Sequence, residues 1–236
     1  MFYSYQHNND ISDYGSDGTL RFDAVLKIFQ EAAILHSASV GYPADSYMGQ
    51  GNIWILNRIM IQPVFFPEFG RQLTVKTWSA GMDKFRGFRN YEITADGEVC
   101  VRGSSIWLYL DIVKKRPVRV TPEMIKNYES EDVPHMGSVI EKWDRKEADS
   151  FLSEKVIGLR PADFDINGHM NNIRYAEIVS TVSRHIDFTG KTIGMFYSHE
   201  IKPDTEEVVT KYSETENSKI FSIYDKDNLA FLCEIF

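Results

Sequence analysis

Residues 163–175 contain the side chains of this sequence that are best suited to chemistry. Asp165, Asn167 and His169 alternate within this stretch. The Asn-Gly pair at 167–168 is typical of a turn, and apolar residues recur at helical spacing after position 175. We therefore expect the polar cluster to lie in a loop that leads into a helix.

The start of such a helix can take part in chemistry. A helix N-terminus offers unpaired backbone N–H groups and a partial positive charge, which can bind an anion or polarise a carbonyl oxygen. We expect these donors near Gly168, Met170 and Asn171. An acid, an amide and an imidazole beside them suit acyl transfer. For the Asn-Gly pair taken alone, the alternative is an ordinary capped helix with a polar lead-in.

A further carboxylate, Glu200, lies in an apolar run that ends at Lys202-Pro203. An inward-facing acid in this run would be costly to bury without partners, although a glutamate on a strand more often faces solvent. His199 would point to the opposite face of a regular strand, so it is not expected to share a site with Glu200. We select Glu200 as the leading candidate to deprotonate a water, and the division of labour with Asp165 is left open.

The composition limits the class of protein. The chain has 236 residues, of which 43% are hydrophobic and 25% charged, as in globular proteins of one large α+β unit or two small domains. It has no stretch of 18 apolar residues and no signal-peptide pattern, so we expect a cytoplasmic protein without a membrane span. A net charge of −8 argues against general nucleic-acid binding. An acidic partner would need a local basic patch, for which the candidates are Lys114, Lys115, Arg116 and Arg119.

The two cysteines, Cys100 and Cys233, lie far apart in strand-like runs. They show no metal-ligand spacing, so we predict buried thiols. The histidines and scattered acids do not form a metal signature either, and we expect neither a metal nor a cofactor.

The sequence repeats itself after about 150 positions. This shift places residues 13–20 over residues 163–170, and an amphipathic helix follows each segment. The apolar face of the first helix is predicted to contain Val25, Ile28, Phe29, Ala32 and His36. Strands are then predicted over residues 54–63, 72–80, 85–94 and 100–111, and again over 194–201, 207–213, 219–225 and 229–236.

The order of these elements, a helix followed by antiparallel strands, occurs twice. A long helix wrapped by a curved antiparallel sheet is the hotdog arrangement, so the predicted fold is an α+β double hotdog. Its units are residues 1–130 and 151–236, with a connector over 131–150. The proline-containing stretch 116–146, with a short helix after Thr121, is long enough for a crossover, which a parallel pairing of the two units requires.

The two copies differ in their polar residues. At the positions of the acid, amide and imidazole of the second copy, the first has Gly15, Asp17 and Thr19. We therefore expect the second copy to be catalytic and the first to form a binding wall for an apolar ligand. Core packing explains most apolar residues of the first copy, but part of the wall is predicted near Ile28, Ala32, Ile55 and Ile59.

Residues 165–175 resemble the Asp-x-Asn-x-His-x-Asn-Asn-x-x-Tyr motif of the acyl-acyl carrier protein (acyl-ACP) thioesterases of plants and bacteria. Further similar segments follow in family order over nearly the whole chain: 26–33 with His36, 52–58, 77–79 and 105–107. The resemblance implies a double hotdog that hydrolyses fatty acyl thioesters of ACP and ends chain elongation in fatty acid biosynthesis. It also implies a catalytic site that consists of Asp165, Asn167, His169 and Glu200.

One position departs from the family. Plant members commonly have a cysteine after the glutamate, whereas this chain has Ile201, which excludes a Cys-His mechanism at this position. Three alternatives are left open: a hotdog acyl-coenzyme A thioesterase, a hotdog dehydratase or hydratase that acts on the carbons next to the carbonyl, and a non-catalytic acyl-binding protein. The last could dispense with the four polar residues. Chain length, carrier and oligomeric state, a homodimer included, are not readable from the sequence.

Overall fold

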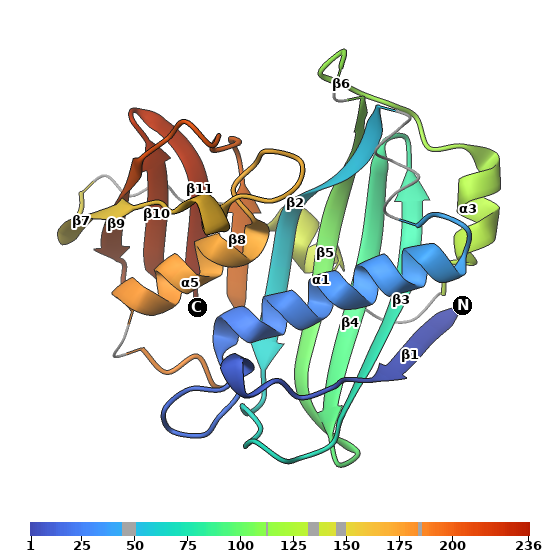
Figure 1. Cartoon of the computed structure of the whole chain (residues 1–236), viewed down its shortest axis with the longest axis horizontal. Coiled ribbons are helices and arrows are strands. Elements are labelled where there is room, and N and C mark those ends of the chain that lie inside the picture. Colours follow the sequence, from blue (N-terminus) through green and yellow to red (C-terminus); the bar gives the residue numbers. More distant parts are fainter. Residues whose placement is uncertain (44–50, 112, 132–136, 145–149, 184–185) are drawn as a thin grey trace.

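The computed structural model describes residues 1–43, 51–111, 113–131, 137–144, 150–183 and 186–236. Its main feature is one large antiparallel sheet, with two helices lying across the same face (Figure 1). In the described part of the chain, no helix is long and apolar enough to cross a membrane.

The first half contains one long helix and most of the long strands. Its elements are β1 (Phe2–Gln6), the 3₁₀ turn η1 (Ile11–Asp13), α1 (Phe22–Ser39), β2 (Asn52–Pro63), β3 (Leu73–Asp83), β4 (Arg86–Ala95), β5 (Glu98–Asp111) and β6 (Arg116–Pro117). The turn between β4 and β5 has positive φ at Asp96 (50°) and Gly97 (87°). A two-residue type I′ turn requires this conformation, which explains why Asp-Gly marks the hairpin.

Helix α1 packs against the sheet through the predicted face, on which Val25, Ile28, Phe29, Ala32 and His36 are all buried. The Phe29 ring stacks on Tyr91 of β4 with the ring centroids 4.4 Å apart. A Cβ added at Gly103 of β5 would lie 2.5 Å from the Phe29 ring. Glycine at this position therefore lets the helix approach the sheet closely.

The second half repeats the arrangement with a shorter helix. It contains β7 (Ser153–Gly158), the 3₁₀ turn η2 (Pro161–Asp163), α5 (Asn172–Val182), β8 (Ile193–Tyr197), β9 (Glu207–Glu214), β10 (Lys219–Asp225) and β11 (Asn228–Ile235). Between the halves lie α3 (Pro122–Tyr128) and α4 (Gly137–Lys142). The α3 helix begins where predicted, because the Thr121 hydroxyl accepts a hydrogen bond from the Met124 N–H (3.1 Å).

The two halves share one sheet with the strand order β1-β3-β4-β5-β2-β8-β11-β10-β9-β7, and β6 pairs with β5 at one side. They join through β2 and β8, which pair antiparallel, so the predicted parallel pairing is wrong. Side chains alternate along β2: Ile59 and Ile61 lie in the core with the helices, and Met60 packs on the other face against Ile140 of α4. The α+β double hotdog is confirmed.

The internal repeat extends to single hydrogen bonds. The Gly15 N–H donates to the Thr19 carbonyl (2.8 Å), and 150 positions later the Asp165 N–H donates to the His169 carbonyl (2.8 Å). The bridges that close the two loops are related in the same way, Tyr14↔Leu20 and Phe164↔Met170. The predicted correspondence of residues 13–20 with 163–170 is therefore confirmed.

The sequence does not predict the two edge strands, β1 and β7. Nearly all of β7 is exposed, so no apolar alternation marks it. The predicted strand 194–201 is also too long, because β8 ends at Tyr197. The N–H groups of Ser198 and His199 both donate to the Ala230 carbonyl (2.9 and 3.2 Å), and the chain leaves the ladder there.

Candidate active site

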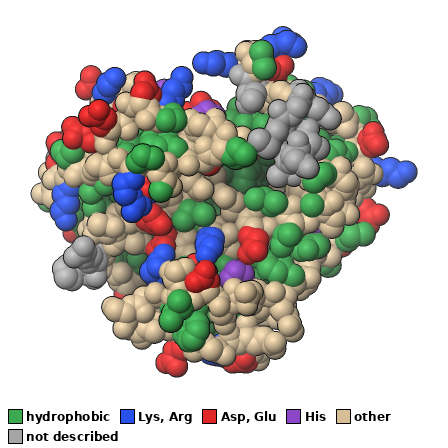
Figure 2. Space-filling view, viewed as in Figure 1, with side chains coloured by type: hydrophobic (Ala, Val, Ile, Leu, Met, Phe, Trp, Pro, Cys, Tyr) green, Lys and Arg blue, Asp and Glu red, His purple; other side chains and the backbone are tan. Residues whose placement is uncertain are grey.

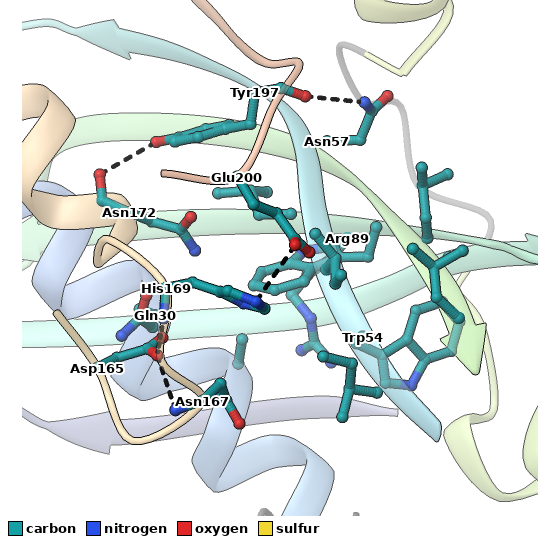
Figure 3. Close-up of a pocket in the computed structure, with 18 of the residues that line it drawn as sticks. Gln30, Trp54, Asn57, Arg89, Asp165, Asn167, His169, Asn172, Tyr197 and Glu200 are labelled. Atoms are coloured by element: carbon teal, nitrogen blue, oxygen red, sulfur yellow. Dashed lines mark hydrogen bonds and ion pairs between the residues drawn. The ribbon is translucent and has the colours of Figure 1, made fainter. Parts of the chain in front are cut away.

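The loop before α5 is organised by Asp165. One carboxylate oxygen of Asp165 accepts hydrogen bonds from the backbone N–H groups of Asn167 (2.8 Å) and His169 (3.3 Å) (Figure 3). Gly168 has φ 72°, a conformation that glycine adopts without strain. Asp165 thus holds the tight turn that presents Asn167 and His169.

The loop is also tied to its helix by Asp163, which is 2% exposed. Its carboxylate pairs with Arg160 (2.7 Å) and Arg174 (3.2 Å). Burial alone would raise the pKa of Asp163, but the hydrogen bonds from Arg160 and the charges of both arginines lower it overall. Asn171 then caps α5 by accepting a hydrogen bond from the Ile173 N–H (3.0 Å).

His169 and Glu200, which are distant in the sequence, meet in the structure. His169 Nε2 lies 3.2 Å from a Glu200 carboxylate oxygen, and the two side chains are 28% and 46% exposed (Figure 3). The two segments are held together by the backbone as well, since the Met170 N–H donates to the Ile201 carbonyl (2.9 Å). An acid and an imidazole are therefore paired at a position open to solvent.

Glu200 reaches His169 from a bend and not from a strand. The expected alternation of His199 and Glu200 onto opposite faces is wrong, because the regular strand has ended at Tyr197. Both residues border the same cavity.

This cavity has a volume of about 850 Å³ and connects the polar cluster with the first half of the chain. All four predicted catalytic residues line it: Asp165, Asn167, His169 and Glu200. Its apolar lining comes largely from the first half and includes Trp54, Leu56, Phe88, Trp107 and Leu108. The arrangement places a water-accessible acid and imidazole at the edge of a space that can hold an apolar chain.

Only one of the four predicted wall residues, Ile55, borders the cavity. The other three are core residues with at most 2% exposure, namely Ile28, Ala32 and Ile59. The apolar face of α1 is occupied by contacts with the sheet, as Phe29 shows. The cavity follows the flank of the helix instead, along Gln30, Ala33, Ile34 and Ser37.

The expected oxyanion donors do not fit the structure. The N–H of Gly168 donates to the Asp165 carbonyl (3.0 Å), that of Met170 to Ile201, and that of Asn171 to the Asp163 carbonyl (2.9 Å). These groups hold the loop and are already bonded. These three N–H groups are therefore not available to a carbonyl oxygen in the cavity.

The cysteines take no part in the site. Both are completely buried, as predicted. Burial raises the pKa of the Cys100 thiol to about 12, and it raises the pKa of the Cys233 thiol as well. A thiol with a raised pKa is a poor nucleophile at neutral pH. Among the described residues, no group of three or more His, Cys, Asp or Glu side chains is placed to hold a metal ion.

The predicted docking residues surround the turn between β5 and β6, and Figure 2 shows basic side chains at the tip of this turn. All four are exposed: Lys114, Lys115, Arg116 and Arg119. Lys115 also borders the cavity, as does Lys202 near Glu200. The basic residues thus lie beside the cavity, and their role in docking stays a prediction.

Sequence reasoning did not select Asn57, Asn172 or Tyr197 as site residues, although all three line the cavity. The Tyr197 hydroxyl donates to the Asn172 carbonyl, and the Asn57 amide donates to the Tyr197 carbonyl (3.3 Å each). Asn57 lies at a bulge, where the register of β2 against β5 shifts between Leu56 and Arg58. A bulge redirects a side chain, so simple alternation could not place Asn57.

Two hotdog units in one sheet, with a polar cluster beside a cavity that has an apolar lining on one side, define a tandem hotdog protein with a candidate active site in its described residues. The sequence matches two family models: the acyl-ACP thioesterase N-terminal domain over residues 2–128 and the acyl-ACP thioesterase C-terminal domain over residues 146–228. The chain belongs to the acyl-ACP thioesterase family.

Similar proteins agree with this assignment. The chain is 27% identical over 222 residues to the chloroplastic acyl-acyl-carrier-protein hydrolase FATB3 of Cuphea viscosissima, with 86% of this chain and 53% of that protein covered. The chain thus spans about half the length of this curated relative.

Two solved structures share the fold. The 12:0-ACP thioesterase from Umbellularia californica superposes with a TM-score of 0.84 at 18% identity, with 99% of this chain and 96% of that chain covered. An acyl-ACP thioesterase from Bacteroides thetaiotaomicron gives a TM-score of 0.82 at 18% identity, with 100% and 97% covered.

Proposed function

We propose that this protein hydrolyses fatty acyl thioesters of ACP to free fatty acids and so ends chain elongation in fatty acid biosynthesis. The observation that carries the proposal is the His169–Glu200 pair, 3.2 Å apart, at the edge of an 850 Å³ cavity with an apolar lining. Membership of the acyl-ACP thioesterase family supports it.

In the proposed reaction, Glu200 accepts a proton from a water molecule, and the resulting hydroxide attacks the thioester carbonyl carbon. The C–S bond of the tetrahedral intermediate then breaks, and the proton returns to the departing pantetheine sulfur. A thiolate leaves readily, so a strong acid is less necessary than for an amide. The products are the carboxylic acid and the free thiol of the carrier.

The other polar residues have supporting roles. His169 holds the Glu200 carboxylate and can bond to the thioester, and Asp165 positions His169 through the loop backbone. The side-chain amide of Asn167 is the proposed donor to the developing oxyanion, because the backbone N–H groups of Gly168, Met170 and Asn171 are already bonded.

We assign the acyl chain to the first unit, residues 1–130, and the chemistry to the second, residues 151–236, with 131–150 as the connector. A phosphopantetheine-bearing ACP is the proposed partner, docked on the basic residues around the β5–β6 turn. A cytoplasmic location stays a prediction, and the Cuphea relative is named chloroplastic.

The test is a panel of acyl-ACP and acyl-coenzyme A thioesters of several chain lengths, followed by thiol release and by mass spectrometry of the product. We expect free thiol and free acid, with higher kcat/KM on the ACP substrates. A preference for coenzyme A esters would make the protein an acyl-coenzyme A thioesterase. An enoyl product without thiol release would overturn hydrolysis.

A further inference from the structure

The cavity contains a buried arginine that the proposed hydrolysis does not use. Arg89 of β4 lines the cavity and is 8% exposed (Figure 3). In the sheet, β5 and β2 lie between β4 and β8. Three strand spacings, about 14 Å along the sheet, therefore separate Arg89 from the strand that leads to Glu200. Arg89 borders the part of the cavity that the far end of an acyl chain would reach.

The described groups that contact Arg89 are all uncharged. Its Nη1 donates to His36 Nδ1 (2.8 Å) and to the Thr77 hydroxyl (3.2 Å), and its Nη2 lies 3.5 Å from the Ser37 hydroxyl. The guanidinium carbon lies 5.9 Å from the centre of the Tyr128 ring. Within the described ranges, no carboxylate forms an ion pair with Arg89.

His36 neither offsets the positive charge of Arg89 nor adds to it. It is completely buried, and burial together with the Arg89 charge lowers the pKa of His36 to about 3. The imidazole is therefore neutral at physiological pH and accepts the hydrogen bond from Arg89 through Nδ1. No described neighbour of Arg89 therefore compensates its positive charge.

A hydrocarbon chain alone cannot satisfy the hydrogen-bond donors of the Arg89 guanidinium. Guanidinium has five N–H donors, and here at most three have acceptors in the described part of the protein. An apolar chain end would displace water from the remaining donors without replacing its hydrogen bonds, which is unfavourable for a buried charge. An oxygen atom on the chain would replace those bonds.

We propose that Arg89, with Ser37 and Tyr128, forms a subsite for an oxygen atom at the far end of the acyl chain. The preferred substrates are then acyl thioesters that carry a hydroxyl, oxo or carboxylate oxygen at or near the terminal carbon. Ser37 and Tyr128 also line the cavity, and their hydroxyls are hydrogen-bonded to each other (2.8 Å). This inference rests on the proposed thioesterase function and specifies its substrate class.

The kinetic test compares acyl-ACPs of equal length whose chains end in a methyl, a hydroxymethyl or a carboxylate group, over several lengths. We expect the wild type to favour an oxygenated end at the length that reaches Arg89. Arg89→Met should lower the ratio of kcat/KM for oxygenated over plain chains by about ten- to a hundredfold, the scale of hydrogen bonds to charged groups. Arg89→Lys should retain part of the preference for the carboxylate.

The matched control is Arg102→Met. Arg102 lies on the neighbouring strand β5, is exposed and pairs with Glu92 (3.2 Å) outside the cavity, so its loss should leave the ratio unchanged. A purely structural Arg89 would lower activity on all chains alike and leave the ratio unchanged, which overturns the proposal. A wild-type preference for plain chains at every length overturns it without any substitution.

A binding experiment separates this proposal from the proposed function. Calorimetry with free fatty acids, hydroxy acids and dicarboxylic acids requires no hydrolysis. Tighter binding of the oxygenated acids to the wild type than to Arg89→Met would support the subsite even if no thioester were cleaved. Hydrolysis of thioesters without any such difference would retain the function and reject the subsite.

Discussion

Replacement of Glu200 tests the chemistry most directly, because two roles for this carboxylate predict losses of different size. If Glu200 only holds His169 by its charge, the loss is limited by the electrostatic energy of the pair. The atoms lie 3.2 Å apart, and the side chains are 46% and 28% exposed. Ion pairs with this much solvent exposure contribute about 1 kcal/mol or less, which is at most about a tenfold effect on rate.

If Glu200 is the general base, the loss is larger, since such a group contributes roughly 10²- to 10⁴-fold. We predict that Glu200→Gln and Glu200→Ala each lower kcat by about 10² or more. The assay is thiol release from acyl-ACP under saturating substrate, with circular dichroism and melting curves to show an intact fold. The matched control is Asp204→Asn, which removes an exposed carboxylate from the same segment.

A folded Glu200→Gln enzyme that loses tenfold or less would refute the assignment of Glu200 as the base. The electrostatic pair alone would then account for the effect. Asp165 would be the remaining carboxylate of the cluster.

Four further predictions concern the loop, the wall, the carrier and the core. Asp165→Ala should lower kcat by about 10²-fold. The double variant Asp165→Ala/Glu200→Ala should lose much less activity than the product of the two single losses. Asp165→Asn keeps the acceptor oxygen for the loop and should retain most of the activity unless Asp165 is the base. Ala33→Phe should shorten the preferred acyl chain because it fills the cavity, whereas Ala32→Phe should lower the melting temperature with an unchanged product profile; identical profiles for both variants would remove Ala33 from the wall. The variants Lys114→Glu and Lys115→Glu in the β5–β6 turn should raise KM for acyl-ACP but not for a small thioester. Added salt should have the same effect, because it screens exposed charges. If neither the variants nor salt changes the kinetics with acyl-ACP, the docking site is rejected. The free energy of unfolding should fall as the pH decreases from about 6.5 to about 3, because the unfolded state binds a proton that buried His36 excludes; the slope in this range should be smaller for His36→Gln, and equal slopes would contradict the low pKa.

The sequence predicts the fold well where periodicity decides it. The buried face of α1 follows from helical spacing, and the β4–β5 hairpin follows from Asp96-Gly97. The sequence does not predict the edge strands β1 and β7, because they are held by backbone pairing and show no apolar alternation. The predicted end of β8 is wrong because the N–H groups of Ser198 and His199 both bond to the Ala230 carbonyl of β11, and the regular strand pairing stops there.

The sequence predicts which of the proposed site residues come together better than it predicts their contacts. The loop of Asp165 and His169 lies where the sequence places it, and Glu200 meets it as expected. The prediction of the wall residues is partly wrong, because helical spacing identifies the apolar face of α1 but does not show that the cavity follows the flank of the helix at Ala33. The orientation of Asn57 depends on a bulge in β2, and the hydrogen bond of the Met170 N–H depends on Ile201, which is distant in the sequence. Neither feature could be predicted from the local sequence.

The junction of β2 with β8 has a consequence for how the chain folds. Their pairing joins residues far apart in sequence, for example Arg58 with Phe196 and Ile61 with Ile193. Such long-range contacts slow folding, and until β8 arrives the nascent first half exposes β2 as an open edge that can template aggregation. A truncated chain that stops before β8 should therefore precipitate or self-associate through β2. Adding the second half in trans should rescue it by capping that edge.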